Sequence, residues 1–228
     1  MATFNAPVAV RIDDSEGRQP VKGGGAVGLC RAYAKRSAIF HQGDPVTHLY
    51  RVESGAVALE LFLEDGRRQL AEILLPGDFC GFAIEHSYHE TAIALQPTVL
   101  SVMRQCDLER AGMSGWDVAR QAGRQIVRTH DHLLALGRKT AQERICQLLL
   151  RLARVIGDRP FQSPRACHGP IRLNVPLTRG EMGDYLGLSL ETVCRTMSAL
   201  QKQGIIEVGP RQGDVTVRAP ELISLLAG

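Results

Sequence analysis

The stretch LTRGEMGDYLGLSLETVCRTMSALQKQG, residues 177–204, has the pattern of two short helices joined by a tight turn. Thr178 is followed three residues later by Glu181, a capping-box spacing that predicts the start of a helix. Gly187 suits the left-handed conformation that ends a helix. Ser189 is then a good N-cap for a second helix through about Lys202. The stretch therefore predicts a helix-turn-helix.

Two runs of β-type residues follow this helix pair, at 205–208 and 215–217, on either side of the turn GPRQGD. Such runs around a Gly- and Pro-containing turn predict a hairpin. A helix pair with a tight glycine turn, followed by a hairpin, is the outline of a winged helix-turn-helix.

The distribution of charge agrees with this reading. Residues 138–228 contain 13 Lys and Arg against 8 Asp and Glu, whereas residues 1–137 contain 14 against 16. A basic C-terminal part suits a polyanionic partner, although ordinary scatter of charges would also produce this difference.

Helical periodicity assigns two faces to the second helix. Val193, Met197 and Leu200 recur at i, i+4 and i+7, so we expect them to face the core. The opposite face consists of Leu190, Glu191, Cys194, Arg195 and Ser198. In a helix-turn-helix, the first turns of that face enter the major groove of DNA.

The residue types on this face suit the reading of bases. Arg195 can donate two hydrogen bonds to guanine, Glu191 can accept one from cytosine N4, and Leu190 can contact a thymine methyl. Contacts to the DNA backbone are expected at the two helix starts, from Thr178, Arg179, Ser189 and Thr192. Alternatively, Glu191 and Arg195 form an exposed i, i+4 ion pair contributing about 0.2–0.5 kcal/mol. The surrounding helix pair and hairpin favour base reading.

The N-terminal part has a different pattern. Residues 1–30 are rich in Gly, Pro and Asp, which predicts a flexible arm. Between residues 31 and 106, glycines recur at positions 43, 55, 66 and 77 with β-type segments between them. This spacing favours an antiparallel sandwich or roll. The expected class is therefore α+β, with a β-roll followed by helices and the winged helix-turn-helix.

Residues 107–137 predict a long helix. Its apolar seam, spaced 3, 4, 3, 4, 3, consists of Ala119, Ala122, Ile126, Thr129, Leu133 and Leu136. Such a seam favours a homodimer through a coiled coil, although the helix could also pack on its own domain. A second amphipathic helix is expected after Thr140, which forms a capping-box spacing with Glu143. This helix opens the DNA-binding part, residues 138–228.

Several classes of protein are disfavoured. No apolar run is long enough to span a membrane, and no secretory signal is visible at the N-terminus. The six cysteines lack CxxC or zinc-site spacing, which favours a reducing cytoplasm and no metal site. No nucleophile–base motif or phosphate loop is present, so we expect no enzymatic activity.

The segment LTRGEMGDYLGLSLETVCR closely resembles the helix-turn-helix of Crp/Fnr-type bacterial transcription regulators, whose recognition helix has an E-x-x-S-R or E-x-x-G-R pattern. LGRKTAQERICQLLLRLA is similar to the segment after the dimer helix in the FixK-like branch. The spaced glycines, with PGDF at 76–79, resemble that family's cyclic-nucleotide-binding-type roll. The resemblance implies a homodimer on double-stranded DNA, with half-sites about 34 Å apart.

The resemblance further implies a TTGA-type palindrome with Glu191 and Arg195 as base readers. It also implies activation through RNA polymerase, often of genes for low-oxygen respiration or nitrogen fixation.

Two departures from the family matter. The N-terminal region has only Cys30, so the ligands of an Fnr-type iron–sulfur cluster are incomplete. Glu90-Thr91 stands where a cyclic-nucleotide pocket would have Arg-Ser, and an acid there would repel a phosphate. Glu85 could replace the sugar-binding acid of that pocket or be a simple loop carboxylate. We therefore expect no cofactor and no cyclic nucleotide.

A haem-dependent or other ligand-dependent gas sensor of the same family is the alternative. Its available iron ligands in the roll are His41, His48, His86, His89 and Cys80. A Soret band in the absorption spectrum would favour this alternative.

Cys194 occupies the Ser or Gly position of the family pattern. It could be a small replacement for Ser. It could also be a redox brake, because oxidation to an acid or a bulky disulfide adduct would place charge or volume where DNA approaches. Arg195 and the helix N-terminus would favour the reactive thiolate, whereas DNA would oppose it.

Overall fold

The structure is a computed structural model that describes residues 29–66, 68–82, 86–104, 114–159, 169–218 and Leu222. Residues 1–28 of the predicted arm, residues 107–113 of the predicted long helix, and Glu85, Cys106 and Cys167 lie outside the described residues. In the described part of the chain, no helix is long and apolar enough to cross a membrane.

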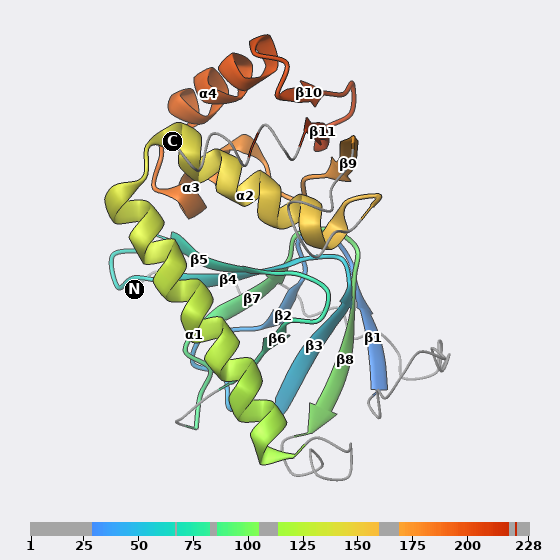
Figure 1. The fold of residues 1–228 in the computed structure, drawn as a ribbon. Helices are drawn as coiled ribbons and strands as arrows, with labels where there is room; N and C mark the ends of the chain where they lie inside the picture. Colours follow the sequence, from blue (N-terminus) through green and yellow to red (C-terminus); the bar gives the residue numbers. More distant parts are fainter. Residues whose placement is uncertain are drawn as a thin grey trace.

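The N-terminal domain is an antiparallel β-roll of two four-stranded sheets (Figure 1). Its strands are β1 (Leu29–Tyr33), β2 (Ala38–Phe40), β3 (His48–Ser54), β4 (Val57–Phe62), β5 (Arg68–Leu74), β6 (Phe79–Cys80), β7 (Thr91–Ala94) and β8 (Thr98–Arg104). The sheet orders are β1-β8-β3-β6 and β2-β7-β4-β5, so the predicted antiparallel roll is confirmed.

The predicted glycine turns explain the regular spacing in the sequence. All four glycines, at positions 43, 55, 66 and 77, have positive φ. At Gly55, a Cβ atom would also lie 2.4 Å from Thr98 Oγ1. Only glycine therefore fits this turn between β3 and β4.

Two helices follow the roll. Helix α1 (Gly115–Arg138) runs along the roll (Figure 1), and helix α2 (Ala141–Ile156) crosses above it. Thr140 and Glu143 form the predicted capping box of α2, with the Glu143 amide donating to Thr140 Oγ1 at 3.3 Å. Ser114 and Asp117 form another at the start of α1.

The C-terminal domain consists of helices α3 (Arg179–Leu186) and α4 (Leu190–Lys202) and a three-stranded sheet of β9 (Pro170–Asn174), β10 (Ile206–Val208) and β11 (Asp214–Arg218). The predicted hairpin is β10–β11, and β9 pairs with β11 as a third strand that the sequence did not indicate.

The two domains share one hydrophobic core. It joins roll residues such as Leu70 and Ile73 to Leu149 of α2 and to Met182 and Tyr185 of α3. Polar contacts reinforce this joint. Arg36 of the roll forms an ion pair with Glu181, Arg68 pairs with Asp184 at 3.1 Å, and Arg151 of α2 pairs with Glu72 at 2.9 Å. The roll therefore fixes the position of α3, the first helix of the helix-turn-helix.

Candidate nucleic-acid interface

The turn between α3 and α4 depends on two glycines. Gly187 has φ 63° and ψ 41°, the left-handed conformation predicted for the end of α3. The Leu188 amide donates to the Gly183 carbonyl at 2.9 Å, which closes the turn. A Cβ atom at Gly183 would lie 2.6 Å from the Leu188 carbonyl oxygen, so a side chain there would push α4 away from α3. The chain can bring these two helices together because both positions lack a side chain.

The N-terminus of α3 is held by the predicted capping box. The Thr178 amide donates to Glu181 Oε2 at 2.7 Å, and the Glu181 amide donates to Thr178 Oγ1 at 3.2 Å. Burial opposes ionisation of Glu181, but hydrogen bonds from Thr178 and the Arg36 guanidinium hold its pKa below the usual value. The start of α3 is therefore rigid, and its capping carboxylate stays charged.

The N-terminus of α4 is capped by Ser189. Its hydroxyl accepts from the Thr192 amide at 3.2 Å and lies 2.9 Å from the Thr192 hydroxyl. Of the four predicted backbone-contacting residues, Ser189 is exposed, whereas Thr178, Arg179 and Thr192 are half-buried.

The two faces of α4 are arranged as helical periodicity predicted. Val193, Met197 and Leu200 are buried. The five residues of the opposite face are all exposed: Leu190, Glu191, Cys194, Arg195 and Ser198.

Neither Glu191 nor Arg195 forms an ion pair with any residue that the structure describes. The alternative prediction, an i, i+4 ion pair between these two side chains, is therefore not observed. Base reading by Leu190, Glu191 and Arg195 stays a prediction.

The cysteines differ in exposure. Among those that the structure describes, Cys80 and Cys146 are buried, Cys30 is half-buried and Cys194 is exposed. Burial raises the pKa of Cys146 to about 11 and also raises that of Cys80, so both thiols stay protonated. Burial lowers the pKa of Arg179, and a negative charge on the nearby Cys194 side chain would oppose that shift. Arg179 is thus a second cation near Cys194, in addition to the neighbouring Arg195.

Helix α1 presents an apolar stripe to solvent. Of the predicted seam, Ala119, Ile126, Thr129 and Leu133 are exposed, and Ala122 and Leu136 are half-buried. Leu136 points toward the α3–α4 turn, where a Cβ atom on Gly187 would lie 3.3 Å from its Cδ2.

The exposed stripe is wider than predicted. It includes Trp116, which is 75% exposed, and also Val127 and Leu134. Val127 and Leu134 are seven residues apart, like Ile126 and Leu133, and this spacing is the sequence signal for a second heptad row beside the predicted seam.

The roll holds a cavity of about 820 Å³ against α1, bounded by Gln42, Tyr88, His89, Glu90 and Ile126, among others. Burial raises the pKa of Glu90. The neighbouring Thr91 is buried, and its hydroxyl accepts from the Gln42 amide at 3.0 Å. Within the described residues, no three His, Cys, Asp or Glu side chains are grouped to hold a metal ion.

Comparisons with known proteins agree with this architecture. Residues 143–224 match the model of a Crp-like helix-turn-helix domain, and residues 30–114 match that of a cyclic nucleotide-binding domain. The chain is 34% identical to the transcriptional activator protein FnrL of Cereibacter sphaeroides, over 82% of this chain and 76% of that protein. It is also 34% identical to the nitrogen fixation regulation protein FixK of Azorhizobium caulinodans, over 85% and 77% respectively.

Among solved structures, FixK2 from Bradyrhizobium japonicum has 32% sequence identity and a TM-score of 0.73, over 88% of this chain and 97% of that one.

Proposed function

The chain belongs to the Crp/Fnr family of transcription regulators, and we propose that it is a FixK-like activator that binds a palindromic promoter site as a homodimer. The observation that carries this proposal is the exposed face of α4, where Glu191 and Arg195 have no ion-pair partner among the described residues. Leu190, Glu191 and Arg195 read bases, while Thr178, Arg179, Ser189 and Thr192 contact the DNA backbone. The protein acts in the cytoplasm, where its promoter DNA lies.

Dimerisation is proposed through α1. The exposed large apolar side chains Ile126 and Leu133, 56% and 58% exposed in the single chain, support a contact with a second copy. A two-fold dimer would present two α4 helices to successive major grooves and would require a palindromic site. Likeness to the transcriptional activator protein FnrL and the nitrogen fixation regulation protein FixK supports activation of nitrogen-fixation genes. Recruitment of RNA polymerase and control of low-oxygen genes form part of the same proposal.

The roll is proposed to work without a cyclic nucleotide, haem or iron–sulfur cluster. When its carboxyl group is ionised, Glu90 would repel a cyclic phosphate in the cavity beside α1. Glu90 would not repel a cationic or a neutral ligand. A ligand-dependent gas sensor is therefore the second candidate function. An absorption spectrum of the purified protein separates the two: no Soret band is expected, and a Soret band would establish the haem-dependent alternative.

A direct binding titration tests the central proposal. We expect the full-length protein to bind a duplex containing a TTGA-type palindrome, with affinity that falls steeply as salt rises because phosphate contacts release counterions. A duplex of the same length with one half-site scrambled should bind at least tenfold more weakly, since only one α4 would find its bases. Equal affinity for both duplexes would rule out palindrome reading.

We further propose that oxidation of Cys194 weakens DNA binding. The thiol is exposed on the same side of α4 as Glu191 and Arg195, whereas Cys80 and Cys146 are buried. Treatment with peroxide should lower operator affinity at least tenfold in the wild type, because a sulfinate or sulfonate would oppose the phosphates. Cys194→Ser should retain its affinity after the same treatment, and Cys146→Ser should behave like the wild type. Equal peroxide sensitivity of Cys194→Ser and the wild type would show that another group is responsible.

A further inference from the structure

Arg36 has an unusual backbone conformation. It lies in the turn between β1 and β2, and its φ is 71°. Among the residues that the structure describes, it is the only residue other than glycine with a positive φ. The turn is held against β7, because the Arg36 amide donates to the Ala94 carbonyl at 2.7 Å and the Ala94 amide donates to the Ser37 carbonyl at 3.0 Å. A strained residue that neighbouring strands hold in place is a candidate for a functional role.

The Arg36 side chain reaches from the roll to the start of α3. Its Nη1 forms an ion pair with Oε1 of Glu181, a residue that is only 4% exposed. The other oxygen, Oε2, accepts from the Thr178 amide at 2.7 Å and from the Thr178 hydroxyl at 2.8 Å. Apart from the ion pair, Oε1 has no hydrogen-bond partner among the described residues. One carboxylate therefore caps α3 through Oε2 and ties α3 to the roll through Oε1.

A second ion pair ties α3 to the roll one turn later. Asp184 Oδ2 lies 3.1 Å from Arg68 Nη2, and the Asp184 carbonyl accepts from Gln69 Nε2 at 2.9 Å. The other terminal nitrogen of Arg68 donates to Oε1 of the buried Glu60 at 3.1 Å. Ties at two points along α3 restrain its rotation on the roll as well as its distance from the roll.

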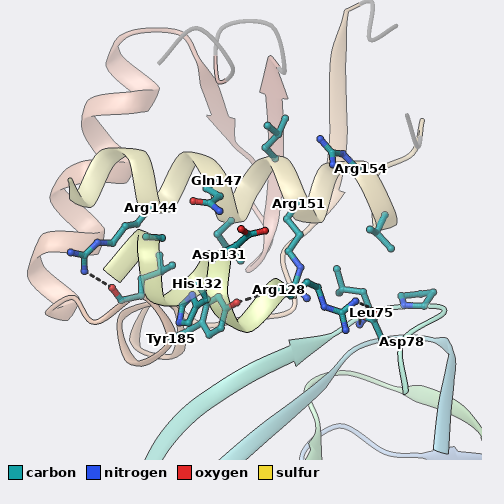
Figure 2. A pocket seen from close by; sticks show the side chains of 16 residues that line it. Leu75, Asp78, Arg128, Asp131, His132, Arg144, Gln147, Arg151, Arg154 and Tyr185 are labelled. Carbon is teal, nitrogen blue, oxygen red and sulfur yellow. Dashed lines mark hydrogen bonds and ion pairs between the residues drawn. The ribbon is translucent and has the colours of Figure 1, made fainter. Parts of the chain in front are cut away.

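A third contact anchors α3 inside the joint between the domains (Figure 2). Arg151 of α2 donates to the Tyr185 hydroxyl at 3.1 Å and to Glu72 Oε1 at 2.9 Å. The His132 ring of α1 stacks on Tyr185 with ring centroids 4.2 Å apart. Tyr185 and Glu72 are buried, so this anchor is part of the core. The Arg36 side chain is 44% exposed, so the tie that it makes can be removed without opening the core.

The position of α3 determines that of α4. The Leu188 amide donates to the Gly183 carbonyl, and a side chain at Gly183 would have no room, so the two helices pack as one unit. Figure 1 shows α3 between β5 and α4. The face of α4 that is proposed to read bases is exposed. The ties to the roll therefore hold the helix pair without covering that face.

We propose that Arg36 is a positioning residue, whose ion pair with Glu181 sets the half-site spacing that the dimer accepts. This inference rests on the proposed function as a homodimer that binds a palindrome. In a two-fold dimer, the distance between the two α4 helices depends on how each DNA-binding domain sits on its own roll. One added base pair moves a half-site by about 3.4 Å and turns it by about 35°. A rigidly held helix pair accepts one spacing, whereas a loosely held pair accepts several.

The test titrates the full-length protein with palindromic duplexes that differ only in half-site spacing, in steps of one base pair around one helical turn. We expect the wild type to prefer one spacing at least tenfold over its neighbours. Arg36→Asn should reduce that ratio at least threefold and lower affinity for the preferred spacing severalfold, because binding must then order α3 on the roll. Asparagine is used because it tolerates the left-handed conformation of this turn.

Arg51→Gln is the matched control. Arg51 is also a partly exposed arginine of the roll, but its ion pair with Glu53, at 3.3 Å, stays within β3. This variant should keep the spacing preference of the wild type. Arg36→Lys should keep most of that preference, because a single nitrogen of Arg36 makes the ion pair.

A double-mutant cycle tests whether Arg36 acts through Glu181. Glu181→Gln removes the charge but keeps a residue type that completes a capping box. It should relax the spacing preference as Arg36→Asn does, and the two substitutions together should relax it no further. A direct contact of Arg36 with a phosphate would instead make the salt dependence of binding smaller in Arg36→Asn and leave the spacing preference unchanged.

That salt-dependent result would overturn the inference. So would a wild type that binds the palindrome without a spacing preference, or Arg36→Asn with the same preference as Arg51→Gln. Arg36→Lys that behaves like Arg36→Asn would overturn it, as would a further loss from Arg36→Asn in the Glu181→Gln protein. A wild type that binds no palindrome at all would overturn the proposed function itself, so the two failures are distinguishable.

Discussion

Arg195→Ala should weaken binding to the operator by about 1–3 kcal/mol per half-site and relax the preference for the base pair that Arg195 contacts. The guanidinium is exposed on α4 and has no ion-pair partner among the described residues, so its removal leaves no unpaired group inside the protein. The expected loss therefore reflects contacts with DNA and not a loss of stability. Titration of matched and base-substituted duplexes measures both effects.

Lys202→Ala is the matched control for Arg195→Ala. Lys202 is also an exposed cation on α4, but it lies at the C-terminal end of the helix, away from the turns that are proposed to enter the groove. Its removal should lower affinity uniformly or leave it unchanged, with the sequence preference retained. If Arg195→Ala kept wild-type affinity and wild-type preference, the base-reading assignment would be wrong.

Ile126→Asp combined with Leu133→Asp should convert the protein to a monomer and reduce operator affinity by about 10²–10⁴-fold. In the single chain both side chains are exposed, so carboxylates there cost little in the monomer. In a dimer they would be buried against a second copy without partners, which is strongly unfavourable. Sedimentation gives the mass, and titration of the full palindrome gives the affinity.

Arg124→Asp is the control for the dimer prediction. It introduces the same carboxylate at an exposed position of α1, but about 160° around the helix from Ile126, by helical geometry. This variant should remain dimeric and bind the palindrome like the wild type. A double variant that stays dimeric would refute the α1 interface. A monomeric double variant that binds the palindrome with full affinity would refute the need for a dimer.

Local signals in the sequence predicted much of the fold. The capping boxes at Thr140 and Thr178 were visible because each involves residues three positions apart. The buried and exposed faces of α4 followed from helical periodicity, because a single packing face determines them. The turns of the roll followed from its glycines, whose positive φ excludes most side chains.

Features that join distant parts of the chain were not predictable in this way. Strand β9 is short, and its place in the sheet comes from pairing with β11, about forty residues later in the chain. The contacts Arg36–Glu181 and Arg151–Glu72 join the roll to α3 and α2 across large sequence separations, so no local pattern indicates them. The exposure of Trp116 at the start of α1 depends on which side of the helix packs against the roll.

Selection of bound sequences from a random pool of duplex DNA, with the full-length protein under reducing conditions, tests the central claim most directly. A dimer that reads DNA through two α4 helices predicts an enriched inverted repeat of TTGA-like half-sites, with centres about one helical turn apart. Enrichment of a single half-site, of a direct repeat or of no sequence at all would contradict the account.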